Sequence, residues 1–281
     1  MFLYFRNPPA PADNVSTHFY ELTFLFFKRC LTSSMVFDSE VTEEALREGV
    51  DLVEFDIGLT RDGVPVLMHD DTLDRTTNMS GLLRDHDFSE LAGECNCAAN
   101  FTRPRGVDLL PDEPQPDGRV PICTLEEVVQ WAKEKNVKML FDVKDSDTKL
   151  VDKIEEVFEQ YDLFDCALVC SFYPWVIYRI KRQNNRILTG VTWRRRSIKI
   201  FLPQFVGADL VLIERGEIYG NFVEDMHNRG LRVCAWTVND TNEMIWMAQK
   251  LKIPFLTDRP LNARHLLDAA DGVNNAELAL N

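Results

Sequence analysis

The sequence predicts an α/β fold of the TIM type, a (β/α)8 barrel, and two observations support this prediction. Short apolar segments rich in β-branched residues recur along the chain and alternate with segments whose apolar residues are three or four positions apart. This is the pattern of buried parallel strands joined by amphipathic helices. The length of 281 residues suits one large α/β barrel. No glycine-rich nucleotide-binding motif follows the early strands, which disfavours an open nucleotide-binding sheet.

Seven segments have the length and composition of buried strands. In chain order they are Leu52–Ile57, Lys138–Val143, Ala167–Phe172, Ile187–Trp193, Leu210–Ile213, Arg232–Val238 and Phe255–Thr257. A possible eighth strand is Leu22–Phe27 ("LTFLFF"), which is apolar and short. A second apolar run, Val64–Met68, follows the turn at 61–63.

Helices are expected between most of these strands. The expected segments are one that opens at Thr124, then Leu150–Phe158, Pro174–Arg182, Ile218–Arg229 and Asn242–Leu251. Thr124 is followed three residues later by Glu127, which is the spacing of a capping box. Pro174 suits the first turn of a helix, where no intrahelical donor is lost.

The region from about 73 to 119 interrupts this alternation. It contains several asparagine, glycine and proline residues and ends near the run Pro-Asp-Glu-Pro-Gln-Pro-Asp-Gly at 111–118. Such a length is unusual for a simple connection, so we expect a small insertion that forms a lobe over the barrel mouth. The predicted organisation is an atypical N-terminal segment (1–40), a barrel domain (41–268) and a C-terminal tail (269–281).

Composition excludes some classes of protein. The net charge of −14 disfavours nucleic acid as a partner and is compatible with a divalent cation site. Seven scattered cysteines do not resemble a disulfide framework, and Cys95 and Cys97 lack a second pair at zinc-site spacing, so free thiols are favoured. The apolar stretch Phe19–Phe37 is interrupted by charges and reads neither as a membrane span nor as a clear signal peptide. We expect a cytoplasmic or membrane-associated protein.

Polar residues at the strand ends indicate a cation site. Glu54 and Asp56 are two positions apart on one predicted strand and therefore share a face. Asp142 ends a later strand, and a barrel gathers such ends at one mouth. Three converging carboxylates repel one another unless a cation lies between them, and hard oxygen ligands suit Mg²⁺ or Ca²⁺.

Three further residues complete the candidate site, each with a structural alternative. His69 follows the second apolar run and is either catalytic or an ordinary surface histidine. Lys144 shares a face with Asp142, and Trp236 ends another strand, where it lines a substrate or packs at the rim of the core. Glu54 and Asp56, taken alone, are equally consistent with solvated strand-end carboxylates.

The stretch "VEFDIGLTRDGVPVLMHDDTLDRTT" (53–77) resembles the glycerophosphodiester phosphodiesterase family. "PICTLEEVV", "LFDVKD", "VCSF", "AWTVND" and "FLTDRP" resemble later family landmarks in the expected order, so the resemblance covers roughly 42–265. It implies a TIM-type barrel with a small insertion and the hydrolysis of a glycerophosphodiester assisted by Mg²⁺ or Ca²⁺. Lysophospholipids are a variant substrate, and a phosphatidylinositol-specific phospholipase C is the nearest alternative enzyme.

The resemblance also implies roles for individual residues. Glu54, Asp56 and Asp142 match the metal ligands, with Asp142 standing where many members carry Glu. His69 matches a catalytic histidine, and Lys144 matches a basic residue near the phosphate. Trp236 lies within the matching "AWTVND" run. The basic run that starts at Trp193 ("WRRR") suggests possible peripheral contact with membrane head groups, or else a solvated loop.

One family feature is missing from the sequence. The family opens with a strand ending in His-Arg-Gly and a Pro-Glu-Asn-Thr segment, and the residues ahead of Thr42 match neither. We expect the first forty residues to be foreign to the family and the activity to be impaired, because the first catalytic histidine and its arginine are absent. The alternative is a non-catalytic barrel that binds metal, phosphate or a protein partner.

Overall fold

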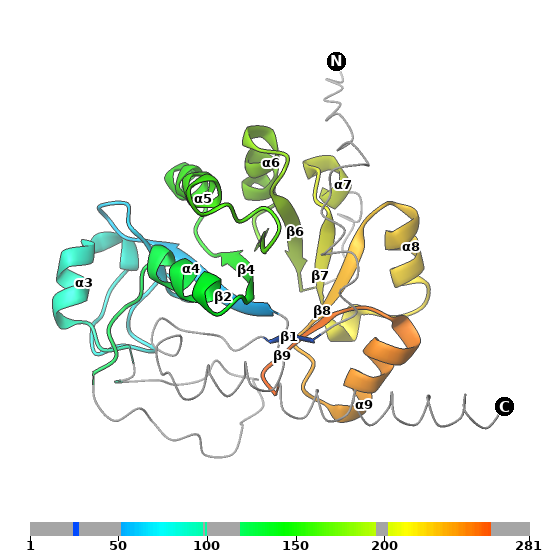
Figure 1. Cartoon of the computed structure of the whole chain (residues 1–281). Coiled ribbons are helices and arrows are strands. Elements are labelled where there is room, and N and C mark those ends of the chain that lie inside the picture. Colours follow the sequence, from blue (N-terminus) through cyan, green and yellow to red (C-terminus); the bar gives the residue numbers. More distant parts are fainter. Residues whose placement is uncertain (1–24, 28–51, 98, 100–118, 195–201, 260–281) are drawn as a thin grey trace.

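The computed structural model describes residues 25–27, 52–97, 99, 119–194 and 202–259. A nine-stranded sheet has the order β1-β9-β8-β7-β6-β5-β4-β2-β3, and β1 also pairs with β2. Every neighbouring pair is parallel except β2–β3, so the pairing of β1 with both β9 and β2 closes a ring of parallel strands. Figure 1 shows the helices outside this ring. The predicted TIM-type barrel is confirmed.

The observed strands agree closely with the sequence patterns. Their bounds are β1 (Leu25–Phe27), β2 (Leu52–Leu59), β3 (Pro65–Leu67), β4 (Lys138–Val143), β5 (Ala167–Ser171), β6 (Leu188–Trp193), β7 (Leu210–Glu214), β8 (Arg232–Trp236) and β9 (Phe255–Thr257). The substitute first strand is present at Leu25–Phe27, with Phe26 beside Leu52 and beside Leu256, and the predicted residues 22–24 lie outside the described residues. The neighbouring 1–24 and 28–51 lie outside the described residues, as does the tail from 260.

The helices are less regular than the strands. They are α3 (Phe88–Glu94), α4 (Leu125–Glu134), α5 (Thr148–Tyr161), α6 (Pro174–Gln183), α7 (Leu202–Val206), α8 (Phe222–Asn228) and α9 (Thr241–Ile245), with η1 (Leu83–Asp85), η3 (Arg215–Glu217) and η4 (Trp246–Leu251). The predicted capping box at Thr124 is confirmed. The helix expected from Ile218 begins only at Phe222, because Gly220 has a φ of 58°, outside the helical region.

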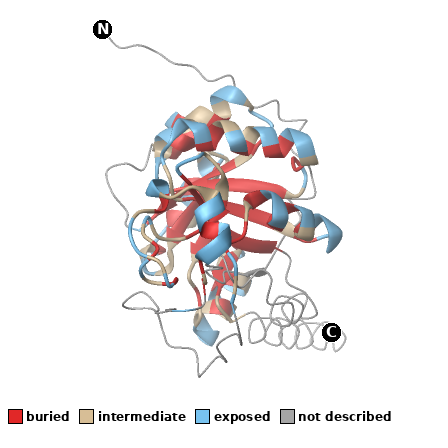
Figure 2. Cartoon of the chain, turned by 90° about the vertical axis from the view of Figure 1, so that its left-hand side faces the viewer, coloured by how far each residue is buried: buried red, intermediate tan, exposed pale blue. Residues whose placement is uncertain are grey.

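Side chains alternate between the barrel interior and the helix layer. On β2, Val53, Phe55 and Ile57 pack outward with the first helices. The interior is filled by a small apolar cluster: Leu52, Leu140, Leu168, Cys170, Leu212, Cys234 and Leu256. In Figure 2 the strands are almost wholly buried, and the helices show exposed outer faces. Because the even positions of β2 and β4 point inward, Glu54, Asp56 and Asp142 must lie inside the barrel.

The described part of the region after His69 packs as a unit of its own. Its core contains Val66, Met68, Leu73, Leu83, Leu91, Cys95, Cys97 and Ile122. Leu83 lies against the carboxyl end of β2, since a Cβ added to Gly58 would stand 2.6 Å from its Cδ2. We call residues 73–97 the lobe. The run 111–118 lies outside the described residues, so the full extent of the insertion remains a prediction.

None of the helices in the described residues combines the length and the apolar character that a membrane crossing requires.

Candidate active site

The structure brings Glu54, Asp56 and Asp142 together at the carboxyl end of the barrel. Strand register is the cause, since Asp56 lies directly beside Asp142 in the β2–β4 pair. One carboxylate oxygen from each of the three residues lies within 4.8 Å of the others. All three are buried, with exposed fractions of 0–2%. We call these three residues the carboxylate cluster.

Lys144 is the counter-charge of this cluster. Its Nζ lies 2.5 Å from Asp142 Oδ2 and 3.0 Å from Asp56 Oδ1. Burial lowers the pKa of Lys144, but the three carboxylates outweigh burial and raise it well above its usual value. The lysine therefore stays charged beside the acidic groups of the cluster.

The cluster fits a hard divalent cation. Its donors are all carboxylate oxygens, which Mg²⁺ and Ca²⁺ prefer. Asp142 Oδ1 is buried and accepts no hydrogen bond from the described residues. A buried carboxylate oxygen is costly without a partner, and a bound cation would supply one. Glu54, Asp56 and Asp142 are therefore suitable ligands for one cation.

A second charged assembly lies just downstream of β3. His69 Nδ1 is 2.5 Å from Asp70 Oδ1, and Arg75 reaches the same carboxylate through Nε (2.5 Å) and one terminal nitrogen (2.9 Å). We call His69, Asp70 and Arg75 the His69 clamp. Burial raises the pKa of Asp70, but hydrogen bonds from His69 and Arg75 hold it well below its usual range. The anionic Asp70 thus fixes Nδ1 of the imidazole and leaves Nε2 for proton transfer.

The clamp is held beside the cluster by the β2–β3 hairpin. The backbone N–H of Met68 donates to the carbonyl of Asp56 at 3.1 Å, which places the residue before His69 next to a cluster residue. Both assemblies therefore belong to the same end of the barrel.

Aromatic side chains line another side of the mouth. The ring of Phe172 forms an edge-to-face contact with Trp236, with centroids 5.7 Å apart. Lys144 Nζ lies 5.3 Å from the centroid of Phe172. Trp236 is therefore at the rim near the lysine, with partial exposure. This contact shows that Trp236 packs beside the site. The role of Trp236 in substrate binding stays a prediction.

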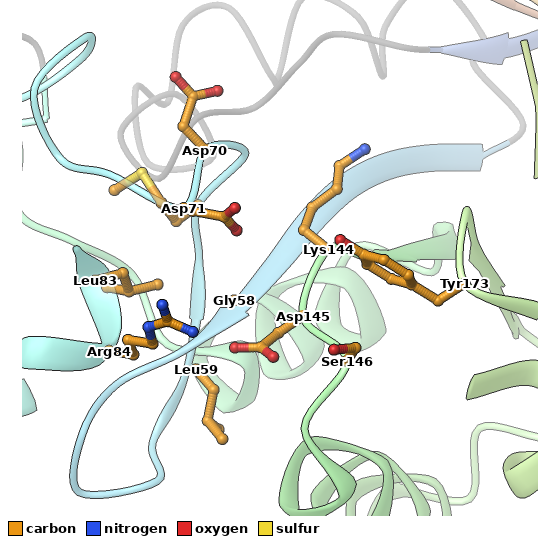
Figure 3. Close-up of a pocket in the computed structure, with 11 residues that line it drawn as sticks. Gly58, Leu59, Asp70, Asp71, Leu83, Arg84, Lys144, Asp145, Ser146 and Tyr173 are labelled. Atoms are coloured by element: carbon orange, nitrogen blue, oxygen red, sulfur yellow. The ribbon is translucent and has the colours of Figure 1, made fainter. Parts of the chain in front are cut away.

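A cavity of about 110 Å³ lies between the lobe and the barrel (Figure 3). Gly58 and Leu83 form part of its apolar wall, whereas Lys144, Asp145 and Tyr173 contribute from the β4 and β5 ends. It has room for several water molecules or a small polar group.

All the residues predicted from the sequence lie at the carboxyl end of the barrel, and their roles remain proposals. The sequence did not predict a role for Arg75 or Phe172, nor for the lobe residues Leu83 and Arg84, which line the cavity. Arg75 belongs to the "DRTT" run, which is part of the stretch that resembles the family, so the sequence could have indicated it. Its contact with Asp70, however, depends on the geometry of the turn between them. In the "WRRR" run, Trp193 is largely buried and Arg194 is exposed, whereas 195 and 196 lie outside the described residues.

Comparison with known proteins agrees with this geometry. Residues 40–262 match the Glycerophosphoryl diester phosphodiesterase family. The chain is 30% identical to glycerophosphodiester phosphodiesterase 1 of Mus musculus, over 78% of this chain and 72% of the mouse protein. It is 28% identical to the Homo sapiens protein of the same name, over 76% and 71% of the two chains.

Solved structures give the same fold. A phosphodiesterase from Oleispira antarctica, in complex with the product sn-glycerol-3-phosphate, superimposes with a TM-score of 0.72 at 20% identity and covers 89% of this chain and 99% of its own. A glycerophosphodiester phosphodiesterase from Agrobacterium tumefaciens gives a TM-score of 0.68 at 18% identity, with coverage of 87% and 100%. At these identities the structures support the barrel fold alone. The match over most of the chain shows that this protein belongs to the glycerophosphoryl diester phosphodiesterase family, a family of phosphoric diester hydrolases.

Proposed function

We propose that this chain binds a glycerophosphodiester at the barrel mouth and hydrolyses it weakly to an alcohol and glycerol phosphate, with help from a divalent cation. The observation that carries the proposal is the buried carboxylate cluster beside Lys144, in a chain of this family. Burial of three carboxylates costs desolvation free energy, and a bound cation would offset that cost.

The residues have distinct roles in this proposal. Glu54, Asp56 and Asp142 hold Mg²⁺ or Ca²⁺, which neutralises charge on the phosphoryl oxygens when bound. Lys144 attracts the phosphate and limits repulsion among the carboxylates. His69 transfers a proton through Nε2, because Asp70 engages Nδ1.

Weak turnover follows from the missing His-Arg-Gly strand end. Loss of one of two proton-transfer groups lowers a rate by about 10²–10⁴-fold. Lys28 and Arg29, which follow the substitute strand in sequence, do not replace it, since an unperturbed lysine titrates near 10.4 and arginine stays charged. A non-catalytic barrel that binds metal, phosphate or a protein partner is the second function, and it is favoured by the same missing residues.

The decisive assay is the release of glycerol-3-phosphate from a glycerophosphodiester, with Mg²⁺, with Ca²⁺ and with a chelator. We expect slow, cation-dependent release that D142N abolishes and D165N leaves unchanged, because Asp165 is an exposed acid away from the cluster. Cation-dependent stabilisation without any release would favour the non-catalytic barrel. A lysophospholipid presented in vesicles tests the variant substrate and membrane contact in the same assay.

A graft tests the proposed impairment. A His-Arg-Gly strand with its Pro-Glu-Asn-Thr continuation, placed ahead of Ala45, should raise turnover by roughly 100-fold or more. Turnover at the usual enzymatic scale of about 1–10³ per second in the unmodified chain would show that other residues perform this chemistry.

A further inference from the structure

Arg84 is a cation at the cavity without an assigned role. It belongs to η1 of the lobe and lines the cavity between lobe and barrel. Unlike Lys144 and Arg75, its guanidinium makes no hydrogen bond or ion pair with another of the described residues. An arginine presents five donors in a fixed planar arrangement, so Arg84 offers unused hydrogen-bonding capacity at this wall.

The backbone around Arg84 is well anchored. Leu83, its neighbour, is 4% exposed and packs over Gly58. The carbonyl of Asp85, on the other side, accepts a hydrogen bond of 2.8 Å from Arg61. The N–H of Leu83 donates to the carbonyl of Asp71 at 2.8 Å, which joins η1 to another segment of the cavity wall. Arg84 is therefore held at the cavity by contacts on both sides.

Acceptors lie around the same space. Asp71 comes from the lobe side, and Asp145 and Ser146 come from the loop after β4. Figure 3 shows the guanidinium of Arg84 and the carboxylates of Asp71 and Asp145 directed toward one region between them. Tyr173, 41% exposed, adds an aromatic ring to the cavity.

This mixture of charges selects the chemistry of a ligand. A cationic group would be attracted by Asp71 and Asp145 but repelled by Arg84, and a second anionic group would be attracted by Arg84 but repelled by the two carboxylates. A neutral group with adjacent hydroxyls satisfies both sets, because each hydroxyl can accept from a guanidinium and donate to a carboxylate. The ring of Tyr173 can cover the apolar face of such a group.

We propose that this cavity is a subsite for the hydroxyl-bearing alcohol part of the substrate, with the exposed Arg84 at its wall as the specificity-determining residue. The proposal rests on the proposed function for the position of the phosphate near Lys144, which lines the same cavity. Hydroxyls occur on the glycerol half of a glycerophosphodiester and also on a polyol esterified to it. The shared chemistry is recognition of neighbouring hydroxyls.

Equilibrium binding tests the subsite without turnover. Three phosphate monoesters are titrated calorimetrically into the full chain: glycerol-3-phosphate, inositol 1-phosphate and phosphocholine, which lacks hydroxyls. We expect at least one of the hydroxyl-bearing esters to bind roughly tenfold or more tightly than phosphocholine, and R84A to remove that difference. The ester that R84A weakens identifies the half of the substrate that occupies the cavity.

Control variants separate recognition from folding. R182A, at an exposed position near the end of α6, should leave all three affinities unchanged, and R84K should retain only part of the preference because it loses the planar donor set. Equal affinities for the three esters, no binding of any, or an unchanged preference in R84A would overturn the subsite. Arg84-dependent binding with no hydrolysis of any diester would instead overturn the proposed function alone.

Discussion

The carboxylate cluster and the His69 clamp are both charged assemblies at the barrel mouth, but they are built in different ways. The cluster takes residues from two parallel strands that are 86 positions apart (Asp56 and Asp142), and strand register aligns them. The clamp takes His69, Asp70 and Arg75 from a single turn region.

Their balance of charge differs as well. The cluster is almost completely buried, and Lys144 contacts two of its three acids. The clamp is about one-quarter exposed and has one acid facing an arginine and a histidine. Three converging buried carboxylates indicate a site that can bind a cation, whereas a carboxylate paired with an arginine and a histidine indicates a group that orients a side chain.

The largest expected effect comes from removing the positive charge of Lys144 beside the cluster. K144M should lower the free energy of unfolding by about 3–5 kcal/mol, because it leaves buried carboxylates without their lysine. Urea denaturation measures this loss, and millimolar Mg²⁺ or Ca²⁺ should restore part of it. K153M, which breaks an exposed ion pair with Glu156, should leave the free energy of unfolding nearly unchanged, because water screens that pair. A small loss in K144M, unaffected by cations, would contradict the ion-site interpretation.

The clamp should respond to pH instead of to cations. The folded-state pKa of Asp70 is depressed, so its stabilisation is fully present above its unfolded value of about 3.9 and is lost as pH falls below it. D70N should therefore destabilise the protein by about 1.5–3 kcal/mol at pH 6 and by less at pH 3. Urea midpoints at the two pH values measure the difference. An equal loss at both would mean that Asp70 acts through packing and not through its charge.

A smaller effect is expected where the lobe meets the strand that carries the cluster. G58A places a methyl group against Leu83, whose flexible side chain must shift, at a cost of about 1 kcal/mol. Hydrogen exchange should rise in 83–94 and remain low in β4. Increased exchange in β4 with unchanged exchange in the lobe would show that the lobe is not seated on Gly58.

The smallest effect should come from a site remote from both assemblies. T124A removes the side-chain cap of α4 and should cost about 0.5–1 kcal/mol in thermal denaturation. Its stabilisation by added cation should equal that of the unchanged protein. A reduced cation response would show that the cluster depends on the helix layer, which would weaken the contrast drawn above.

The cluster was easier to predict than the clamp, for a physical reason. Alternation along a strand fixes the face of Glu54 and Asp56, and parallel strands bring Asp142 to the same end, so sequence alone locates them. No such periodicity governs Arg75, whose approach to Asp70 depends on turn geometry. The contact of Phe172 with Trp236 depends on the curvature of the closed barrel, which the sequence does not give. The start of α8 was predicted too early, because the backbone of Gly220 is not helical.

The closing strand has a consequence for how the protein is made. In β1, Leu25 pairs with Phe255, so the contact spans 230 positions of the chain (255 − 25). Contacts of such long sequence separation form late, because their loop-closure entropy is compensated only after other parts are ordered. During synthesis, an amino-terminal strand must wait for nearly the whole polypeptide before its second neighbour exists. Until β9 has been made, the edges of β1 and β8 stay open to pairing with other chains, which makes the nascent protein vulnerable to aggregation at that stage.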